Sequence, residues 1–206
     1  YSVDVADVNG DGKLDLVASN QRSDNVSVLL GNGNGTFQNQ TTFATGSFPM
    51  SVKVADVDGD GRGDVVVTNF SGDTLSVLLG NGNGTFQAKQ TFATGSVPFG
   101  LVIADLDGDG RLDLAAANFS GNSVSVLINN RNGTFATATT YPVTGTPAQI
   151  AVADVDKDGC LDLLTPNAAG NSFAVLFNNG GTNGTLSFAS AVYTDAGTSQ
   201  RPNFLA

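Results

Sequence analysis

The most constraining feature of the sequence is a nine-residue acidic segment that occurs four times at a constant interval of 49 residues. Its second copy, residues 56–64, reads DVDGDGRGD and carries carboxylates at its first, third, fifth and ninth positions. The other copies begin at Asp7, Asp105 and Asp154. A constant interval of this size is typical of a repeat architecture, in which each repeat is one supersecondary unit. We therefore expect one repeat array along the whole chain.

Each repeat contains four segments with the pattern of β-strands, most clearly in the second repeat. Residues 51–55 alternate apolar and polar side chains, and residues 65–67 form a β-branched run that predicts a strand covered on both faces. Residues 75–79 and 85–92 complete the set around Asn-Gly turns. No segment has helical periodicity. The predicted fold is all-β: a β-propeller of four-stranded antiparallel blades, with about 49 residues per blade.

The repeats divide approximately at 1–49, 50–98, 99–147 and 148–197, and residues 198–206 resemble the start of a further repeat. Four repeats are thus present, and we expect them to be part of a larger propeller. A closed ring of four blades and a larger ring formed by two chains remain alternatives. Two sets of residues recur with the same interval and are expected to pack between blades: Phe37, Phe86 and Phe135, and Pro49, Pro98 and Pro147.

The acidic residues are concentrated in the repeated segments. All nineteen are Asp, and fifteen lie in the four segments. Four divalent cations would add eight positive charges and change the formal charge from −10 to −2. The nine Lys and Arg residues form no basic stripe, which argues against nucleic acid as a partner. No apolar run is long enough to span a membrane.

Oxygen ligands at alternate positions of a tight loop favour a hard cation with six to eight ligands, which is calcium before magnesium. The first, third and fifth positions offer side-chain oxygens, the seventh offers its backbone carbonyl, and the ninth closes the shell. Gly at the sixth position allows the sharp turn. The alternative is that these segments are polar turns that bind no metal. In that case nothing would compensate the repulsion between the clustered carboxylates. The predicted ligands are Asp7, Asn9, Asp11, Lys13 and Asp15; Asp56, Asp58, Asp60, Arg62 and Asp64; Asp105, Asp107, Asp109, Arg111 and Asp113; and Asp154, Asp156, Asp158, Cys160 and Asp162.

The loop DxDGDGxxD between two strands, followed by SVLLGNGNGTF, resembles the FG-GAP or VCBS repeat family, whose propellers are similar to the head of integrin α chains. The resemblance covers essentially the whole chain. It implies that the loop joins the first two strands of a blade and binds Ca²⁺, with up to four ions here. Two copies depart from the motif. Asn9 removes one charge from the first loop, and Lys157 replaces Gly at the fourth position of the last.

The leading functional hypothesis is a non-catalytic, calcium-binding extracellular propeller that acts in adhesion or ligand presentation, secreted or at the cell surface. Its partners would be a protein or glycan at the loop faces, with further blades from the same or another chain. A carbohydrate-binding lectin is the alternative, although the chain has no Trp and the Phe residues read as internal. A propeller-based lyase or hydrolase is a third hypothesis. It would have to use Asp4, Asp24, Asp73 or Asp195, which lie outside the loops.

Overall fold

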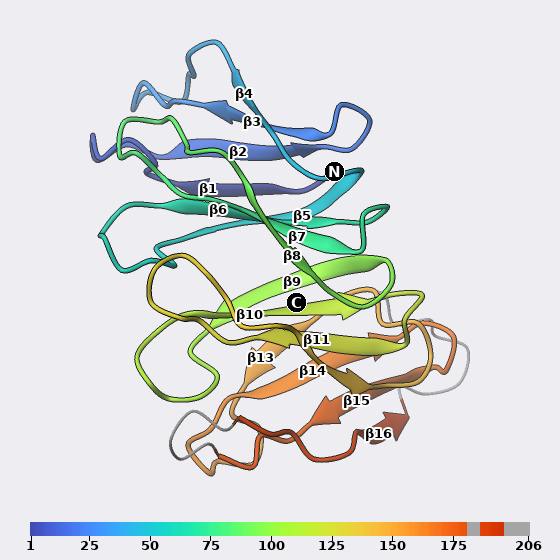
Figure 1. The fold of residues 1–206 in the computed structure, drawn as a ribbon. Coiled ribbons are helices and arrows are strands. Elements are labelled where there is room, and N and C mark those ends of the chain that lie inside the picture. The colour runs from blue at the N-terminus through green and yellow to red at the C-terminus, as the bar shows by residue number, and fades with distance from the viewer. Residues whose placement is uncertain (181–185, 196–206) are drawn as a thin grey trace.

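The computed structural model describes residues 1–180 and 186–195, which form sixteen β-strands and no helix (Figure 1). No helix in these ranges could therefore cross a membrane. The predicted start of a further repeat, 198–206, lies outside the described residues. The strands form four antiparallel sheets of four strands each, in sequence order, here called blades 1 to 4. This arrangement confirms the predicted all-β fold with four-stranded propeller blades.

The blades have closely similar strand boundaries. Blade 1 consists of β1 (Val3–Ala6), β2 (Asp15–Asn20), β3 (Asn25–Leu29) and β4 (Thr41–Ala44). Blade 2 consists of β5 (Pro49–Ala55), β6 (Asp64–Asn69), β7 (Thr74–Leu78) and β8 (Gln90–Ala93). Blade 3 consists of β9 (Pro98–Ala104), β10 (Asp113–Asn118), β11 (Ser123–Leu127) and β12 (Thr139–Pro142). Blade 4 consists of β13 (Ala151–Ala153), β14 (Asp162–Asn167), β15 (Ser172–Leu176) and β16 (Val192–Asp195).

The fourth strand of blade 2 begins later than the sequence pattern predicts. In blade 2 the expected strand was 85–92, whereas β8 starts at Gln90. The Asn81 N–H donates to the Thr85 carbonyl at 2.9 Å and closes a tight turn. Phe86 then makes a single bridge to Gly80, and its side chain packs against Phe43 of blade 1. The Gln87 N–H donates to the Leu79 carbonyl at 2.8 Å, and regular strand pairing begins at Gln90.

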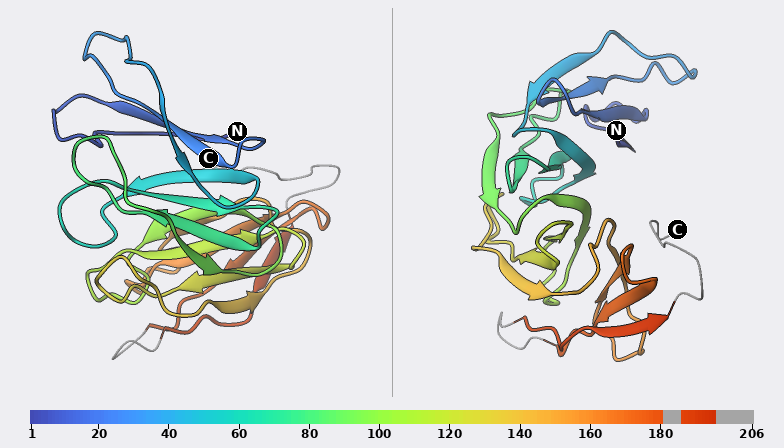
Figure 2. Two further views of the ribbon diagram at one scale, coloured as in Figure 1. Left: turned by 45° about the horizontal axis from the view of Figure 1, so that its top comes forward. Right: turned by 90° about the vertical axis from the view of Figure 1, so that its right-hand side faces the viewer.

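The four blades follow one another in an arc, with blade 1 at one end and blade 4 at the other (Figure 2). The first strands of neighbouring blades lie side by side, since β5 contacts both β1 and β9. The second strands are central to their sheets, and all six residues of β6 and of β10 are buried. The β-branched run at 65–67 thus predicted correctly a strand covered on both faces.

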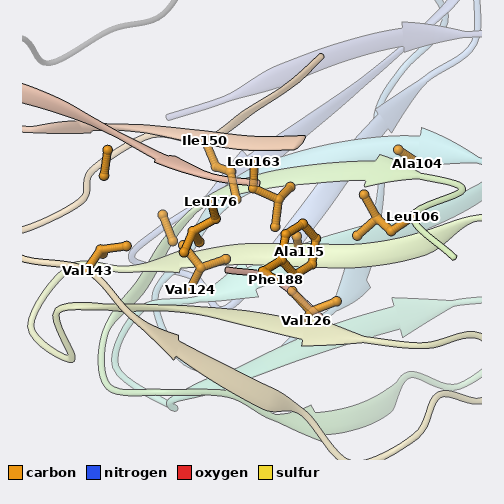
Figure 3. Packing of buried hydrophobic residues seen from close by; sticks show 12 residues of the cluster. Ala104, Leu106, Ala115, Val124, Val126, Val143, Ile150, Leu163, Leu176 and Phe188 are labelled. Carbon is orange, nitrogen blue, oxygen red and sulfur yellow. The ribbon is translucent and has the colours of Figure 1, made fainter. Parts of the chain in front are cut away.

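Three hydrophobic cores lie between successive blades. The first joins Val17 and Val26 of blade 1 to Val65 and Leu78 of blade 2, and corresponding residues form the second core between blades 2 and 3. Figure 3 shows the third core, where Ala115 and Val124 of blade 3 meet Leu163, Leu176 and Phe188 of blade 4. Burial of each Val or Leu side chain contributes about 1.5–3 kcal/mol, so contact between blades is a major source of stability.

Edge-to-face aromatic pairs recur at these junctions. The ring centroids are 5.1 Å apart for Phe43 and Phe86, 5.4 Å for Phe92 and Phe135, and 5.1 Å for Tyr141 and Phe188. The expectation that Phe86 and Phe135 pack between blades is confirmed, and Pro49, Pro98 and Pro147 are buried. The expectation for Phe37 is wrong. Its side chain is 39% exposed, because blade 1 lies at one end of the arc and no blade within residues 1–180 and 186–195 packs against it.

Candidate metal-binding site

Each acidic segment forms the loop between the first and second strands of its blade. In blade 2 the loop connects β5 to β6. Gly59 and Gly61 have φ of 80° and 85°, a left-handed conformation that glycine adopts without steric cost. These two glycines fold the backbone around the first carboxylate of the loop.

The first carboxylate is bound by the backbone of its own loop. Asp56 Oδ1 accepts the Gly59 N–H at 2.8 Å, and Oδ2 accepts the Gly61 N–H at 2.8 Å. Asp7, Asp105 and Asp154 accept the corresponding N–H groups in the other loops. The Gly12 N–H, with its neighbours, lowers the pKa of Asp7, because these bonds favour the ionised form. The first position therefore holds a carboxylate in fixed orientation.

The ninth carboxylate is buried and links three parts of the blade. Asp64 Oδ2 accepts the Val57 N–H at 2.8 Å, and Oδ1 accepts the Gly80 N–H, after the third strand, at 2.7 Å. Asp15, Asp113 and Asp162 make the same pair of bonds. Burial raises the pKa of Asp64 and of Asp113 to about 6 despite these bonds. A cation close to such a buried carboxylate would favour its ionised form.

Three loops bring carboxylate oxygens of the first, third and ninth positions together. Within the part of the chain that the structure describes, three groups have ligand atoms that all lie within 4.8 Å of one another. They are Asp56, Asp58 and Asp64; Asp105, Asp107 and Asp113; and Asp154, Asp156 and Asp162. Burial also raises the pKa of Asp58. Asp107 Oδ2 is buried and has no hydrogen-bond partner among the described residues. These three Asp triads could hold metal ions.

The fifth carboxylate has a different environment and belongs to none of these groups. Asp60 Oδ1 accepts the Arg62 N–H at 2.9 Å, and its other oxygen pairs with the Arg62 guanidinium at 3.4 Å. Lys13 pairs with Asp11 at 3.1 Å, and Arg111 pairs with Asp109. The fifth position thus neutralises the side chain of the seventh. In the last loop the seventh residue is Cys160, which offers no cation.

The first and last loops depart from this pattern as the sequence indicates. Asn9 supplies an amide oxygen in place of a carboxylate, so the first loop has only Asp7 and Asp15 at the converging positions. The Asn9 Oδ1 accepts the Asp11 N–H at 2.9 Å. In the last loop Lys157 has φ of 68°, where the other loops have glycine. The loop therefore keeps its conformation at the cost of backbone strain.

Neighbouring loops enclose cavities. One of about 560 Å³ is lined by Asp56 and Asp58 of the second loop and by Arg111, Asn129 and Arg131 of blade 3. A corresponding cavity of about 620 Å³ lies between the third and fourth loops. Both place the carboxylates of one blade opposite residues of the next. The loops thus contribute to shared grooves between the blades.

Some residues with a structural role were missed by the sequence pattern. Asp24, Asp73 and Asn122 have left-handed φ and accept the N–H groups of Phe48, Val97 and Thr146, which lead into the next blade. Their interval of 49 residues was a signal that could have identified them. A cluster of contacting, partly exposed rings was also missed. The expectation that the Phe residues are internal is wrong for the four Phe residues of this cluster. The rings of the cluster are those of Tyr1, Phe48, Phe70, Phe99 and Phe119.

Solved structures with similar folds are propeller proteins of several functions. An Agrocybe aegerita lectin that recognises non-reducing terminal N-acetylglucosamine is 27% identical, with a TM-score of 0.58, over 92% of this chain and 50% of its own. A streptogramin B lyase is 17% identical, with a TM-score of 0.57, over 91% and 58%. BBS1N, in complex with ARL6DN, is 14% identical, with a TM-score of 0.61, over 89% and 55%. The chain thus spans between half and three fifths of these structures.

No curated protein matched the chain in sequence. A family model described as FG-GAP-like repeat matches it three times, over residues 7–67, 56–116 and 105–165. Each match begins at the first Asp of a loop. Together the matches cover well over half of the sequence and include all four loops. The chain therefore belongs to the FG-GAP-like repeat family.

Proposed function

We propose that this chain is a calcium-binding propeller that acts outside cells as a non-catalytic module for adhesion or ligand presentation. The observation that carries the proposal is the convergence of three carboxylates within 4.8 Å in each of three loops. Hard oxygen donors in a flexible loop are the ligands that calcium prefers. A single array over residues 1–206 would then carry up to four ions, one in each loop.

The donor set fits a cation on two counts. Asp107 Oδ2 is a buried acceptor without a hydrogen-bond partner in the described residues, and burial of an unpaired charge is costly. Burial also holds the pKa of Asp64 and Asp113 near 6, so their ionised forms are disfavoured without a positive charge nearby. A divalent ion at the third loop would give Asp107 Oδ2 a partner and would favour the ionised form of the buried Asp113. An ion at the second loop would do the same for Asp64.

The proposed ligands are the side-chain oxygens of the first, third and ninth positions, including Asn9 in the first loop. The fifth carboxylates and the seventh carbonyls remain proposed ligands of lower weight, because Asp60 is paired with Arg62. Bound calcium would supply charge neutralisation and cross-linking of the loop. With free calcium at about 100 times the dissociation constant, each site would add roughly 2.7 kcal/mol to stability.

Extracellular location and a non-catalytic role are part of the same proposal. Short loops that lack Glu are expected to need the higher calcium concentration found outside cells. Of the acidic residues outside the loops, Asp4, Asp24 and Asp73 accept backbone N–H groups of Val54, Phe48 and Val97. These bonds connect successive blades and support a structural use of the three carboxylates.

A carbohydrate-binding lectin is the second candidate. It is supported by the 27% identity to the N-acetylglucosamine-binding lectin and by the partly exposed ring cluster around Phe99. Aromatic faces are suitable for stacking against apolar sugar surfaces. Calorimetric titration with N-acetylglucosamine tests this candidate, and glycan-array binding extends the test to other sugars. If neither the titration nor the glycan array shows binding, the lectin candidate is excluded and a protein-binding module remains.

Thermal unfolding in calcium and in EDTA tests the calcium proposal. The melting temperature should fall substantially on chelation, because three or four sites contribute to stability. A variant with Asp58→Asn, Asp107→Asn and Asp156→Asn retains side-chain size but removes one charge from each triad. Its melting temperature should respond much less to calcium. An unchanged wild-type melt in EDTA would refute the proposal.

A further inference from the structure

The second residue after the third strand of each blade differs between the two halves of the array. Repeats 1 and 2 have Gly31 and Gly80 at this position, whereas repeats 3 and 4 have Asn129 and Asn178. In all four blades the N–H of this residue donates to the ninth carboxylate of the acidic loop. The two Asn residues are 2% and 3% exposed, so each brings a buried amide next to a proposed calcium ligand. A buried amide needs hydrogen-bond partners.

The side-chain amide of Asn129 joins two acidic loops. Its Nδ2 donates to the carbonyl of Val57, the second residue of the second loop, at 2.7 Å. The same nitrogen donates to the carbonyl of Leu112, the eighth residue of the third loop, at 2.8 Å. Its Oδ1 accepts the Arg131 N–H at 2.8 Å, which fixes the orientation of the amide. One buried side chain therefore connects the backbones of two neighbouring loops.

Asn178 makes the same connection between the third and fourth loops. Its Nδ2 donates to the Leu106 carbonyl at 2.8 Å and to the Leu161 carbonyl at 3.2 Å. Leu106 is the second residue of the third loop, and Leu161 is the eighth residue of the fourth. The Asn178 Oδ1 accepts the Gly180 N–H at 3.1 Å. Because two successive junctions have this bridge, it is a regular feature of this part of the array.

The bridges connect the buried ninth carboxylates into one network. Asp64 accepts the Val57 N–H, and the Val57 carbonyl accepts Asn129 Nδ2. The Asn129 N–H in turn donates to Asp113. The equivalent bonds through Asn178 connect the third loop to the fourth. Hydrogen bonds in a buried chain of this kind polarise and strengthen one another. The second, third and fourth loops therefore share one buried hydrogen-bond network.

The junction between the first and second loops has a different bond. A Cβ at Gly80 would overlap the carbonyl oxygen of Gly63, so this backbone has no room for a bridging side chain. The carbonyl of Val8, the second residue of the first loop, accepts the Gly84 N–H at 3.2 Å. Gly84 lies in the turn after the third strand, and its N–H is not the one that donates to Asp64. Within residues 1–180 and 186–195, the first loop is therefore not part of the Asn-bridged network.

We propose that Asn129 and Asn178 are positioning residues that make calcium binding by the second, third and fourth loops cooperative, while the first loop binds calcium independently. This inference rests on the calcium-binding function proposed above. An ion that orders one loop fixes the shared Asn and, through it, the ninth carboxylate of the next loop. The next loop then loses less conformational entropy when it binds its own ion. Repulsion between neighbouring divalent ions would couple the loops with the opposite sign.

A calcium titration followed by NMR of protein with isotope-labelled glycine tests the proposal. Each loop has glycine at its sixth position, so Gly61 reports the second loop and Gly110 the third. Asp58→Asn weakens the second site directly. If the two loops are coupled, this substitution should also raise the calcium concentration at the Gly110 midpoint, by about fivefold or more. In an Asn129→Gly background, the same Asp58→Asn substitution should leave the Gly110 midpoint unchanged.

The third and fourth loops allow the same measurement at a second junction. Asp107→Asn should raise the midpoint of Gly159 in the fourth loop, and Asn178→Gly should abolish this dependence. Both Asn→Gly substitutions introduce the residue that repeats 1 and 2 already have, so the variants are expected to fold. A glycine spectrum with the wild-type dispersion confirms folding. The second junction provides an independent result if one of the variants does not fold.

Two substitutions serve as matched controls. Asn9→Ala weakens the first loop and should leave the Gly61 midpoint unchanged, because no Asn bridge joins these two loops. Ser71→Arg changes an exposed turn residue of blade 2, where repeat 1 already has Arg22, and should move no midpoint.

The outcomes distinguish failure of the coupling from failure of calcium binding. A Gly110 midpoint that stays the same or falls in Asp58→Asn would overturn the proposal. A rise that persists in the Asn129→Gly background would overturn the role of Asn129. If the loop glycines of the wild type do not respond to millimolar calcium, the calcium-binding function itself is refuted, and the coupling with it.

Discussion

The second and third acidic loops differ from the first and fourth in composition but not in backbone hydrogen bonding. The second and third loops have Asp at all four acidic positions and Gly at the fourth, whereas the first loop contains Asn9 and the fourth contains Lys157. In all four, the first and ninth carboxylates accept the same N–H groups. The loop scaffold therefore depends on these two carboxylates. The third and fourth positions adjust charge and strain.

Loss of a ninth carboxylate should have the largest effect. Asp64→Ala leaves the N–H groups of Val57 and Gly80 buried and unpaired, which should lower the free energy of unfolding by about 2–5 kcal/mol. Asp162→Ala in the fourth loop should have an effect of similar size, because its bonds to Val155 and Asn178 are both 2.9 Å. Urea unfolding in EDTA measures the free energy of unfolding of both variants without a contribution from bound metal. A large effect in only one loop would show that the scaffold is not shared.

Exchange of the fourth residue should have a smaller effect. Lys157→Gly removes a left-handed non-glycine residue and should stabilise the protein by about 1 kcal/mol. Gly108→Lys, at φ of 74° in the third loop, should destabilise it by a similar amount. Thermal unfolding in EDTA compares the two substitutions. Changes of the same sign would contradict strain as the difference between these loops.

Exchange of the third residue should convert one kind of site into the other. Asp58→Asn gives the second loop the ligands of the first, and Asn9→Asp does the reverse. Calcium affinity should fall in the former and rise in the latter by a factor on the order of ten, because ligand charge sets affinity in such loops. Calorimetric titration should show one more weak calcium site in Asp58→Asn and one fewer in Asn9→Asp. Unchanged titrations would exclude the third position from the metal shell.

The metal-free protein should also depend on pH through the second and third loops. The folded state raises the pKa of Asp64 and Asp113 from 3.8 to about 6, so it favours their protonated forms. Their contribution to stability is present below pH 3.8 and is lost as the pH rises through about 6. In EDTA, the melting temperature should therefore be higher at pH 5 than at pH 7.5. Asp64→Asn combined with Asp113→Asn should reduce this difference, and a wild-type melt higher at pH 7.5 would contradict it.

The blades and the location of the loops could be predicted from sequence because they depend on the repeat interval and on local patterns. The run at 65–67 identifies a strand buried on both faces, and the acidic loops identify the convergence of the first, third and ninth positions. The pairing of Asp60 with Arg62 was not predicted. It depends on side-chain directions within a loop, which residue types alone do not determine.

Other features depend on which blades are neighbours in space. The sequence treats Phe37 and Phe86 as equivalent, yet of these two only Phe86 has a blade against it in the described part of the chain. The ring cluster around Phe99 brings together residues from three blades, so no local pattern indicates it.

Equilibrium dialysis of the chain against radioactive calcium tests the central claim most directly. We predict three or four bound ions per chain, with a weaker class that includes the first loop. Asp64→Asn should remove one ion, while Ser71→Arg should bind as many as the wild type. Binding of fewer than one ion per chain at millimolar calcium would contradict the assignment of the acidic loops as calcium sites.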